Sequence, residues 1–394
     1  MLDFEFVSPT HFVFGKDAEL QVGEKLANAG AKKVLLHFGG QSAKKTGLID
    51  RVEKSLSDAG IEFVELGGVR PNPEITLVRQ GQKICKEQGI DWILAVGGGS
   101  VIDSSKGIGI SANYDGDPWD FYDKKVEVTQ CLPIAVVLTI PAAGSEASKN
   151  SVVSNDELQL KTGVGNNLER PKFAFMNPEL TMSLPSYQTG AGCTDMFAHL
   201  LERYFDDQGT VTVTDNLNVS LMKTVRSEAL RVMNNPDSYD ARANIMWAGM
   251  LCHQGLAGVG RSEDWATHGL EHELSALKPE VTHGAGLAVM FPAWMTYVFK
   301  ENKDRFCRYG YEVFGLSPSG CKCSDSKAAI KATRDFFVSL GMPKNLRELG
   351  FVEDDIEKMI PTLKINKGEV FGSFKKLTMD DAREIYKIAL DLDI

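Results

Sequence analysis

Histidine and aspartate residues occur in the second half of the chain at spacings that suit a divalent metal ion. The chain has 7 histidines, and three of them, His268, His272 and His283, lie close together in the sequence. Asp195 and His199 lie one helical turn apart, which places both side chains on one face of a helix. A carboxylate with two or three imidazoles is a typical ligand set for a divalent first-row metal. The pattern therefore predicts a metal site.

The same segment admits another interpretation. His268-Gly-Leu-Glu-His272 matches the inverted zincin peptidase signature, in which Glu271 would be the general base. That interpretation leaves the glycine-rich segments of the first half without a role, and short motifs also match by chance. The peptidase therefore remains a remote alternative.

A glycine-rich segment in the first half suits a phosphate-bearing cofactor. The apolar run 92–96 leads into Gly97-Gly98-Gly99-Ser100, and a helical pattern follows over 101–110. Glycines let a ligand approach the backbone, and the helix directs unpaired N–H groups and the positive end of its dipole toward the loop. We expect Ser100 to cap this helix with Asp103 as its capping-box partner. The alternative is a tight turn that binds no ligand.

A second glycine pair, Gly39 and Gly40, follows the apolar run 34–38, and Ser42, Lys44 and Lys45 lie just beyond it. In dinucleotide sites, an acidic residue at this strand end binds the ribose 2′-hydroxyl of NAD and would repel the 2′-phosphate of NADP. Because glycine takes that place here, the sequence favours NADP, with NAD as the alternative. At least one of the two lysines is better interpreted as part of a solvated helix face.

The remaining patterns of the first half predict the elements that position these segments. Three helical patterns end at Gly30, Gly60 and Gly89, as glycine-terminated helices do. Apolar runs recur about every 30 residues, as βαβ crossovers between buried parallel strands require. We therefore predict an α/β domain with a doubly wound, mostly parallel sheet, and residues 4–14 as an added strand pair. The expected helices cover 17–29, 46–59 and 74–88, and the expected strands 34–38, 63–66, 92–96 and 134–138.

The second half is expected to be all-helical. Its last helix should begin at Thr378, with Asp381 as the acidic partner of this cap, and should bury Ile385, Ile388 and Ala389. We place the domain boundary at residue 185, so that residues 1–185 form the dinucleotide-binding domain and residues 186–394 form the helical domain that binds the metal and carries catalysis.

Composition excludes several classes of protein. The chain has 53 acidic and 43 basic residues and a net charge of -10, which argues against a nucleic-acid binder or a basic membrane-surface protein. No apolar run approaches the roughly 18 residues of a membrane helix, and the first residues lack a signal-peptide pattern. The 7 cysteines are scattered and odd in number, as in a reduced compartment. We expect a cytoplasmic protein without nucleic-acid or membrane partners.

Taken together, the motifs resemble the iron-containing (group III) alcohol dehydrogenases, in particular their NADP-linked butanol dehydrogenase and aldehyde reductase branch. The resemblance covers nearly the whole chain. Two positions depart from the branch: Gln41 replaces a glycine of the usual GGGS, and Ala143 replaces Thr or Gly. The matching motifs are GGQSAKKTG at 39–47, RPNPE at 70–74, GGGSVIDSSKGIG at 97–109, LTIPAAGSEAS at 138–148, DMFAHLLERYF at 195–205 and EDWATHGLEHELSALKPEVTHGAGLAVMFPAW at 263–294.

The resemblance implies an N-terminal Rossmann-like domain and a helical C-terminal domain, the architecture shared with dehydroquinate synthases. By motif position it implies that Fe²⁺ or Zn²⁺ is bound by Asp195, His199, His268 and His283, with His272 beside the nicotinamide and the substrate. It also implies a set of cofactor contacts: Gly39, Gly40, Ser42 and Asn72; Gly97, Gly98, Gly99, Ser100 and Asp103 around the diphosphate; and Thr139, Ser145 and Lys161 along the nicotinamide half.

The implied reaction is hydride transfer between NADP(H) or NAD(H) and a short primary alcohol or aldehyde, such as butanol or butanal. The metal would act as a Lewis acid, and His272 would relay the proton. A glycerol dehydrogenase-like enzyme, a dehydroquinate synthase-like enzyme and a protein that only binds cofactor remain alternatives. We expect a homodimer, the commonest assembly. Trp265 and residues 290–294 either shape a pocket for an aliphatic chain or belong to the core.

Overall fold

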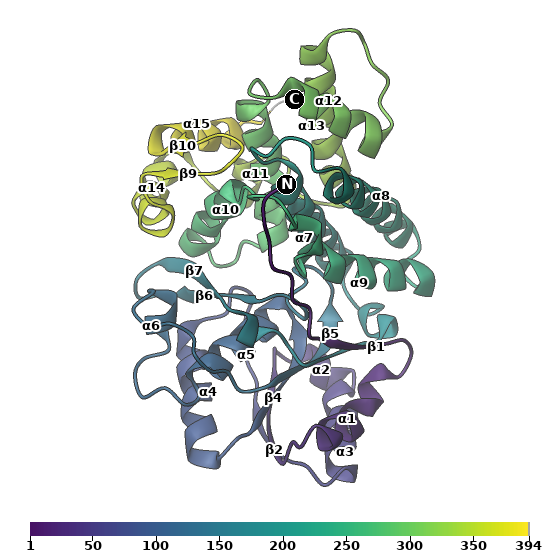
Figure 1. The fold of residues 1–394 in the computed structure, drawn as a ribbon, viewed down its shortest axis with the longest axis vertical. Coiled ribbons are helices and arrows are strands. Elements are labelled where there is room, and N and C mark those ends of the chain that lie inside the picture. The colour runs from purple at the N-terminus through teal and green to yellow at the C-terminus, as the bar shows by residue number, and fades with distance from the viewer. Residues whose placement is uncertain (393–394) are drawn as a thin grey trace. The chain divides into compact units, whose positions relative to one another are not determined.

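The computed structural model describes residues 1–392, which form two compact units (Figure 1). The first, here called the sheet unit, is Val7–Ser183. The second, here called the helical unit, combines Met1–Phe6 with the chain from Leu184 onward. No helix in the described residues is long and apolar enough to cross a membrane.

The sheet unit is built on six parallel strands in the order β1-β8-β5-β4-β2-β3. The central strands are buried on both faces, which explains their continuous apolar sequences. The predicted α/β fold with a parallel sheet is confirmed. The strands are β1 (His11–Phe14), β2 (Lys33–Phe38), β3 (Glu62–Leu66), β4 (Trp92–Gly98), β5 (Ile134–Ile140) and β8 (Phe173–Met176).

Helices cover both faces of this sheet. Two of them, α1 (Val22–Asn28) and α3 (Leu48–Asp58), pack against each other and share a core with the strands. On the other side of the sheet, α4 (Ile75–Gln88) packs against α5 (Gly99–Ser111), as Figure 1 shows. The glycines predicted to end helices, Gly30, Gly60 and Gly89, all have positive φ. Two short helices, α2 (Ser42–Lys45) and α6 (Trp119–Tyr122), complete the helices of this unit.

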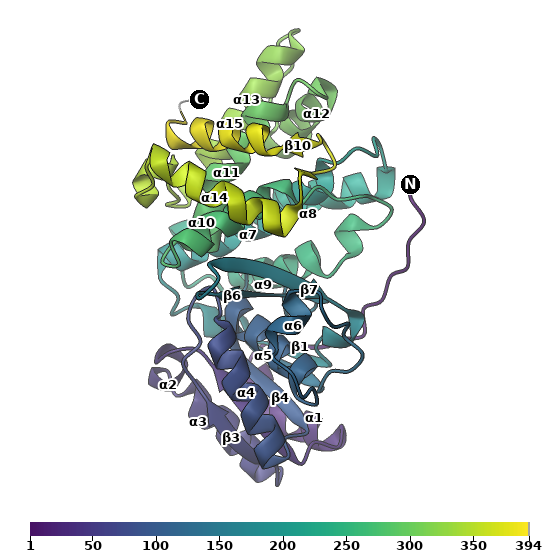
Figure 2. The ribbon, with the colours of Figure 1, turned by 90° about the vertical axis from the view of Figure 1, so that its left-hand side faces the viewer.

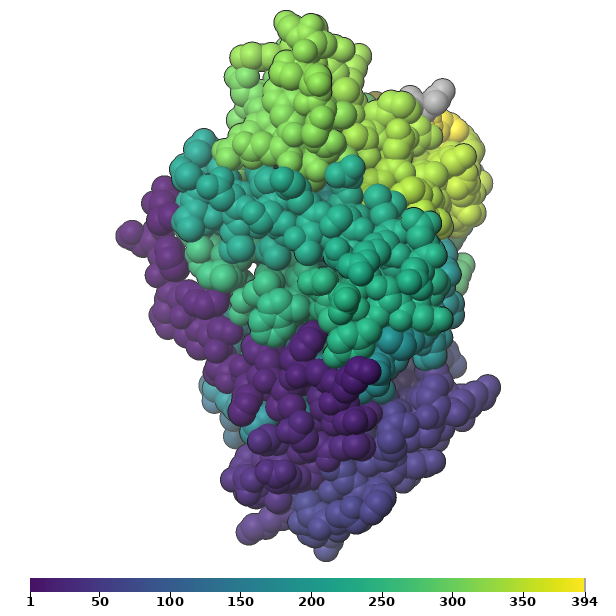
Figure 3. All heavy atoms as spheres, turned by 90° about the vertical axis from the view of Figure 1, so that its right-hand side faces the viewer, coloured from purple at the N-terminus to yellow at the C-terminus, as the bar shows by residue number. Residues whose placement is uncertain are grey.

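The predicted strand pair over residues 4–14 is wrong. Only His11–Phe14 forms a strand, at the sheet edge beside β8. Pro9 has no N–H group to donate to a strand neighbour, which is consistent with the interruption. Met1–Phe6 belongs instead to the helical unit, where Leu2 N donates to Gly260 O at 2.9 Å. Figure 3 shows these opening residues (dark purple) on the surface, and Met1, Leu2 and Phe4 are exposed.

One hairpin of the sheet unit has no counterpart in the sequence prediction. Strands β6 (Asn150–Asn155) and β7 (Leu160–Gly165) pair antiparallel. The hairpin is attached near the start of α4, because Ser154 N donates to Pro73 O at 2.8 Å. This hairpin carries Lys161, one of the expected cofactor contacts.

The helical unit agrees with the prediction except for two short paired strands, β9 (Val370–Phe371) and β10 (Leu377–Thr378). The last helix begins with the predicted capping box of Thr378 and Asp381. Helices α14 and α15 lie side by side (Figure 2). The helices are α7 (Ser186–Tyr204), α8 (Thr212–Asn234), α9 (Tyr239–His253), α10 (Ala266–Leu277), α11 (His283–Val298), α12 (Lys303–Phe314), α13 (Lys322–Ser339), α14 (Glu353–Lys367) and α15 (Met379–Leu390).

The core of the helical unit surrounds α11. The segment Met290–Met295 is fully buried and joins the main apolar cluster. Of the two interpretations of residues 290–294, the structure therefore supports the core.

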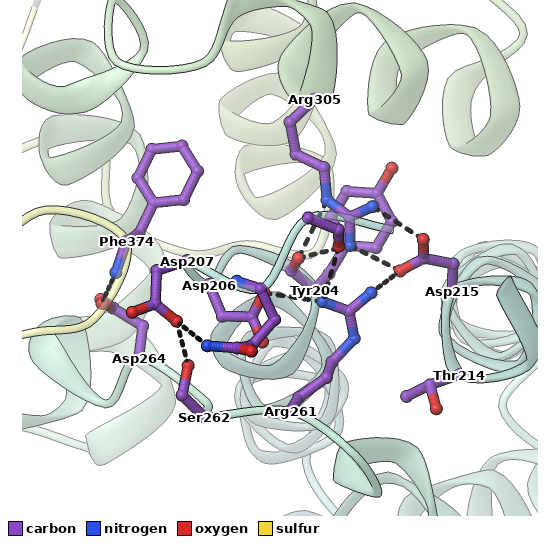
Figure 4. Close-up of polar contacts among 12 residues, drawn as sticks. Tyr204, Asp206, Asp207, Thr214, Asp215, Arg261, Ser262, Asp264, Arg305 and Phe374 are labelled. Carbon is purple, nitrogen blue, oxygen red and sulfur yellow. Dashed lines mark hydrogen bonds and ion pairs between the residues drawn. The ribbon is translucent and has the colours of Figure 1, made fainter. Parts of the chain in front are cut away.

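A cluster of buried ion pairs joins three parts of the helical unit (Figure 4). Asp215 near the start of α8 accepts hydrogen bonds from Arg305 and Arg308 of α12 and from Arg261. Arg261 also donates to Asp206 at 2.7 Å. The side chains of Asp215 and Arg261 are completely buried, so this cluster fixes the α8–α12 contact from inside.

Candidate functional site

The strand order of the sheet unit reverses between β2 and β4. From β2 the chain continues to β3 on one side, and from β4 it continues to β5 on the other. In open α/β sheets, ligands bind beyond the carboxyl ends of the strands at such a switch point. Gly39 and Gly40 follow β2 directly, and Gly97 and Gly98 end β4. Both glycine segments singled out in the sequence therefore lie at the switch point.

The predicted capping box of α5 is wrong. Strand β4 runs straight into the helix, which begins at Gly99, so Ser100 is already a helical residue and Gly98 is the N-cap. Asp103 bonds elsewhere: it accepts hydrogen bonds from Ser145 Oγ at 2.5 Å and from Val152 N at 3.0 Å. Within the described chain, no side chain caps α5. Its first N–H groups and positive dipole end remain suited to an anion such as a diphosphate.

The glycines of the two loops differ in whether neighbouring atoms leave room for a side chain. A Cβ at Gly97 would overlap the Val101 side chain, and one at Gly98 would lie 2.9 Å from Ile140 Cβ. The chain itself therefore requires both glycines. A Cβ at Gly39 would make only ordinary contacts, the nearest at 3.6 Å, and Gly39 lacks a positive φ. Local packing therefore leaves room for a side chain at position 39.

The expected contacts of the nicotinamide half lie in two hydrogen-bonded groups and on one strand. Lys161 Nζ donates to Asn72 Oδ1 at 2.9 Å, and both side chains are buried. Ser145 bonds to Asp103 as described above. Thr139 is half-buried on β5.

Lys106 is a buried residue of this region that sequence analysis missed. Its Nζ donates to Ser145 Oγ at 2.9 Å, to Ser148 O at 3.0 Å and to Asn150 O at 2.8 Å. Burial lowers the pKa of Lys106. Lys106 therefore ties the 145–150 segment to α5.

Ser42 and the two lysines beyond the first glycine pair are exposed. Lys44 Nζ lies 2.6 Å from Glu65 Oε2 and 4.9 Å from the centre of the Phe38 ring. The hydrogen bond to Glu65 raises the pKa of Lys44. This lysine thus has a partner at the end of β3, which favours the helix-face interpretation for Lys44.

Three helices bring together the four expected metal ligands, which are here called the metal group. Asp195 and His199 lie on α7, His268 lies on α10, and His283 is the first residue of α11. The three imidazole rings surround Asp195 Oδ1: His199 Nδ1 lies 3.1 Å from it, and His268 Nε2 and His283 Nε2 each lie 3.9 Å from it. Helices α7 and α11 approach so closely that a Cβ at Gly284 would overlap the carbonyl oxygen of Ala191 on α7.

These donors fit a divalent cation. Asp195 Oδ1 and His268 Nε2 are buried, and neither has a hydrogen-bond partner among the described residues. Buried polar atoms without partners are rare in proteins and point to a missing ion or water. Metal–ligand bonds of about 2.0–2.2 Å let one ion reach two atoms up to about 4.2 Å apart. The 3.9 Å separation of these two atoms falls within that reach.

The protonation states of Asp195 and His199 also suit a cation. Burial alone would raise the pKa of Asp195, but the contacts with His199 and His268 hold it well below its usual range. Burial lowers the pKa of His199. An ionised carboxylate and a neutral imidazole are the forms in which these side chains ligate metals.

His272 lies beside this group. Its side chain is half-buried, and its ring centre is 5.6 Å from that of His283. Glu271, the general base of the peptidase interpretation, is completely buried and bonds to His283 Nδ1 and Ser275 Oγ. The carboxylate is thus turned toward protein groups, which disfavours the peptidase.

Sequence analysis missed two side chains beside the metal group, His253 and Arg203. The His253 ring lies 4.3 Å from that of His199, and Arg203 Nη2 lies 2.9 Å from His253 Nδ1. Trp265, whose φ is positive, lies 5.1 Å from the His268 ring and beneath the Arg203 guanidinium. His253 stands alone in the sequence, so no spacing pattern links it to His199.

Comparison with known proteins identifies the family. Residues 9–178 match the family described as iron-containing alcohol dehydrogenase, and residues 189–390 match the C-terminal model of the Fe-containing alcohol dehydrogenase family. NADH-dependent butanol dehydrogenase A of Clostridium acetobutylicum is 40% identical over 98% of this chain and 99% of its own length. The NADPH-dependent aldehyde reductase YqhD of Escherichia coli is 33% identical over 99% of this chain and 100% of its own.

A solved structure agrees with these matches. The crystal structure of NADH-dependent butanol dehydrogenase A from Thermotoga maritima aligns with a TM-score of 0.96 at 37% identity and covers 99% of each chain. A nicotinamide cofactor and a metal are expected for the family of these relatives, and the Asp/His group described above is a candidate for the metal. The chain therefore belongs to the iron-containing alcohol dehydrogenase family and is an oxidoreductase of that family.

Proposed function

We propose that the protein interconverts short primary alcohols and aldehydes, such as butanol and butanal, with a nicotinamide cofactor and a bound Fe²⁺ or Zn²⁺. The observation that carries this proposal is the meeting of Asp195, His199, His268 and His283, in which Asp195 Oδ1 and His268 Nε2 are buried and have no hydrogen-bond partner among the described residues. The substrate class is supported by the relatives, which are named as butanol dehydrogenases and an aldehyde reductase.

The proposed division of labour follows the two halves of the chain, with residues 1–185 binding the cofactor and residues 186–394 binding the metal. The four Asp/His residues would hold the ion, which when bound supplies Lewis-acid polarisation of the substrate oxygen. His272 is half-buried beside His283 and would carry a proton between the substrate oxygen and solvent. The start of α5 would hold the cofactor diphosphate.

For the cofactor we propose a preference for NADP(H), with NAD(H) also accepted. The preference is supported by Gly39, which leaves the end of β2 without the acidic side chain that would repel a 2′-phosphate. Local packing does not force this glycine. The pairing of Lys44 with Glu65 leaves Lys45 and Ser42 as the better candidates to meet the phosphate. The named relatives include both NADH- and NADPH-dependent enzymes.

One assay tests the reaction. The purified protein, stripped of metal and reloaded with Fe²⁺ or Zn²⁺, is given NADPH or NADH and a panel of short aldehydes, and cofactor oxidation is followed at 340 nm. Glycerol with NAD⁺ is included to test the glycerol dehydrogenase alternative. We expect metal-dependent oxidation with butanal. Absence of turnover with every aldehyde and both cofactors, in protein shown to contain the metal, would overturn the proposal.

A variant tests the metal group directly. His268→Ala should lose the bound metal and turnover together, because it removes one of the ligand atoms at Asp195. Metal content is measured by atomic emission, and turnover is measured on the same preparation. A variant that is free of metal and fully active would refute the ligand assignment.

We also propose a homodimer located in the cytoplasm. The 7 cysteines are all free, which suits a reduced compartment. The dimer rests on the general prevalence of twofold assemblies. Light scattering during size-exclusion chromatography tests it, and a mass of one chain would refute it.

A further inference from the structure

Each histidine of the metal group has its Nδ1 atom engaged by an oxygen. His199 Nδ1 lies 2.8 Å from the carbonyl oxygen of Asp195, and His268 Nδ1 lies 2.8 Å from Glu202 Oε1. His283 Nδ1 bonds to Glu271 Oε2. A neutral imidazole that donates a hydrogen bond from Nδ1 carries its lone pair on Nε2. The three contacts therefore leave Nε2 as the ligand atom of all three rings.

Glu202 is built into the helix that carries the first two ligands. It lies on α7, one turn beyond His199, and its side chain is 1% exposed. Its Oε1 accepts two hydrogen bonds from His268, from the backbone N and from Nδ1, both at 2.8 Å. Helix α7 thus supplies the carboxylate that orients the ligand of α10.

Glu271 repeats this arrangement one helix later. It lies on α10, is completely buried, and bonds to His283 at the start of α11, while its other oxygen accepts from Ser275 Oγ. Helix α11 makes room for it: a Cβ at Gly286 would lie 2.7 Å from Glu271 Cγ and 2.8 Å from its Oε1. The absence of a side chain at Gly286 therefore leaves space for the Glu271 carboxylate.

We propose that Glu202 and Glu271 are positioning residues that hold His268 and His283 as Nδ1–H tautomers, with Nε2 presented to the metal. The inference rests on the proposed metal site. Burying a carboxylate is costly unless it is bonded, and each of these carboxylates bonds to a histidine of the metal group. Carboxylates bonded to the outer nitrogen of a metal-bound histidine fix its orientation and raise its basicity.

The experiment uses Glu202→Met and Glu271→Met, which remove the acceptor with little change in volume. Glu273→Met is the matched control, because Glu273 is also buried on α10 but accepts a hydrogen bond from Asn366 at 2.7 Å. Gly286→Ala is a further variant that displaces the Glu271 carboxylate and leaves every titratable group in place.

The first measurement is the tautomer of each histidine in metal-free protein, from the ¹⁵N chemical shifts of histidine-labelled samples at a pH where the rings are neutral. We expect Nδ1–H for His268 and His283 in the unmodified protein. Glu202→Met should release His268 alone, and Glu271→Met or Gly286→Ala should release His283 alone. Unchanged tautomers in folded variants, or Nε2–H rings in the unmodified protein, would overturn the proposal. Should a Met variant at position 271 fail to fold, Gly286→Ala decides the role of Glu271.

The second measurement is the Zn²⁺ dissociation constant, from competition with a chelator. Loss of such an outer partner weakens metal binding by about 10–100-fold, and we expect this in the Glu202 and Glu271 variants and not in the control. If unmodified protein binds Zn²⁺ no better than Asp195→Ala, the proposed metal site fails, and the tautomers still test the carboxylates. If Zn²⁺ binds tightly and equally in all variants, the positioning role fails and the metal site stands.

Discussion

The buried carboxylate of Asp215 should be one of the most sensitive single positions for the stability of the helical unit. It bonds to Arg305 through both oxygens, at 2.9 and 2.6 Å, and to Arg261 (Figure 4). It also accepts a hydrogen bond from Arg308 at 3.0 Å. In Asp215→Ala these guanidinium groups lose a shared anion at a site that water does not reach.

The size of the effect follows from the partners that remain. Removing one member of a buried ion pair costs about 3–5 kcal/mol, because the other charge is left uncompensated. Arg261 keeps Asp206, and Arg308 keeps Glu312, whereas Arg305 keeps only the carbonyl oxygen of Tyr204 and the face of its ring among the contacts described for it. We therefore expect a loss of about 3–4 kcal/mol. For a unit of about 200 residues, each kcal/mol lowers the melting temperature by about 2–4 °C.

Differential scanning calorimetry measures this loss, and circular dichroism at 222 nm checks the helical content. Asp207→Ala is the control, since it removes the same charge from a neighbouring, exposed carboxylate bonded to Ser262 and Gln208. Exposed substitutions of this kind change stability by about 0.5 kcal/mol at most. An Asp215→Ala protein that melts within about 2 °C of the control would refute the reasoning.

Two further predictions concern a buried acid and the cofactor. Burial raises the pKa of Glu146 to about 7, so the folded protein binds a proton there more tightly than the unfolded chain does. This group therefore lowers the free energy of unfolding as the pH rises from about 4.5 to 7. Glu146→Gln should be more stable than the unmodified protein by up to about 3 kcal/mol at pH 8 and equally stable at pH 4. Urea unfolding at the two pH values measures this, and a difference independent of pH would contradict the assignment. Gly39→Asp should weaken NADPH binding by at least about fivefold more than NADH binding, because two charges about 4 Å apart repel by about 1 kcal/mol even in water. Fluorescence titration measures the affinity for each cofactor, and equal losses of the two affinities would contradict the 2′-phosphate argument.

Local patterns predicted those parts of the fold whose causes are local. Helices that end at Gly30, Gly60 and Gly89 and are followed by apolar strands repeat along the chain, and this repeat predicted a mostly parallel sheet. The hairpin β6–β7 escaped prediction because its first strand, Asn150–Asn155, is rich in polar residues and derives its burial from other segments. The capping prediction at Ser100 failed because the partners of Asp103 lie more than forty residues away.

The metal group, too, could be predicted from the sequence only in part. Asp195 with His199, and His268 with His272, are helical neighbours that spacing alone can detect. Their meeting across three helices is a tertiary fact. The residue types predicted a metal site, whereas the choice of Asp195, His199, His268 and His283 as its ligands came only from the resemblance to a family. Glu202 has no such signal, because the partner that explains its burial lies on another helix.

The backbone contact between α7 and α11 at Gly284 bears on how quickly a bound ion would exchange. His283 precedes Gly284, and α11 is held against Ala191 of α7, so His283 cannot retreat from Asp195 by a shift of its backbone unless the two helices separate. Side-chain rotation takes picoseconds to nanoseconds, whereas local opening of packed helices takes microseconds to seconds. Exchange of the ion should therefore follow the opening rate of this helix pair, and amide hydrogen exchange along α7 and α11 should report the same event.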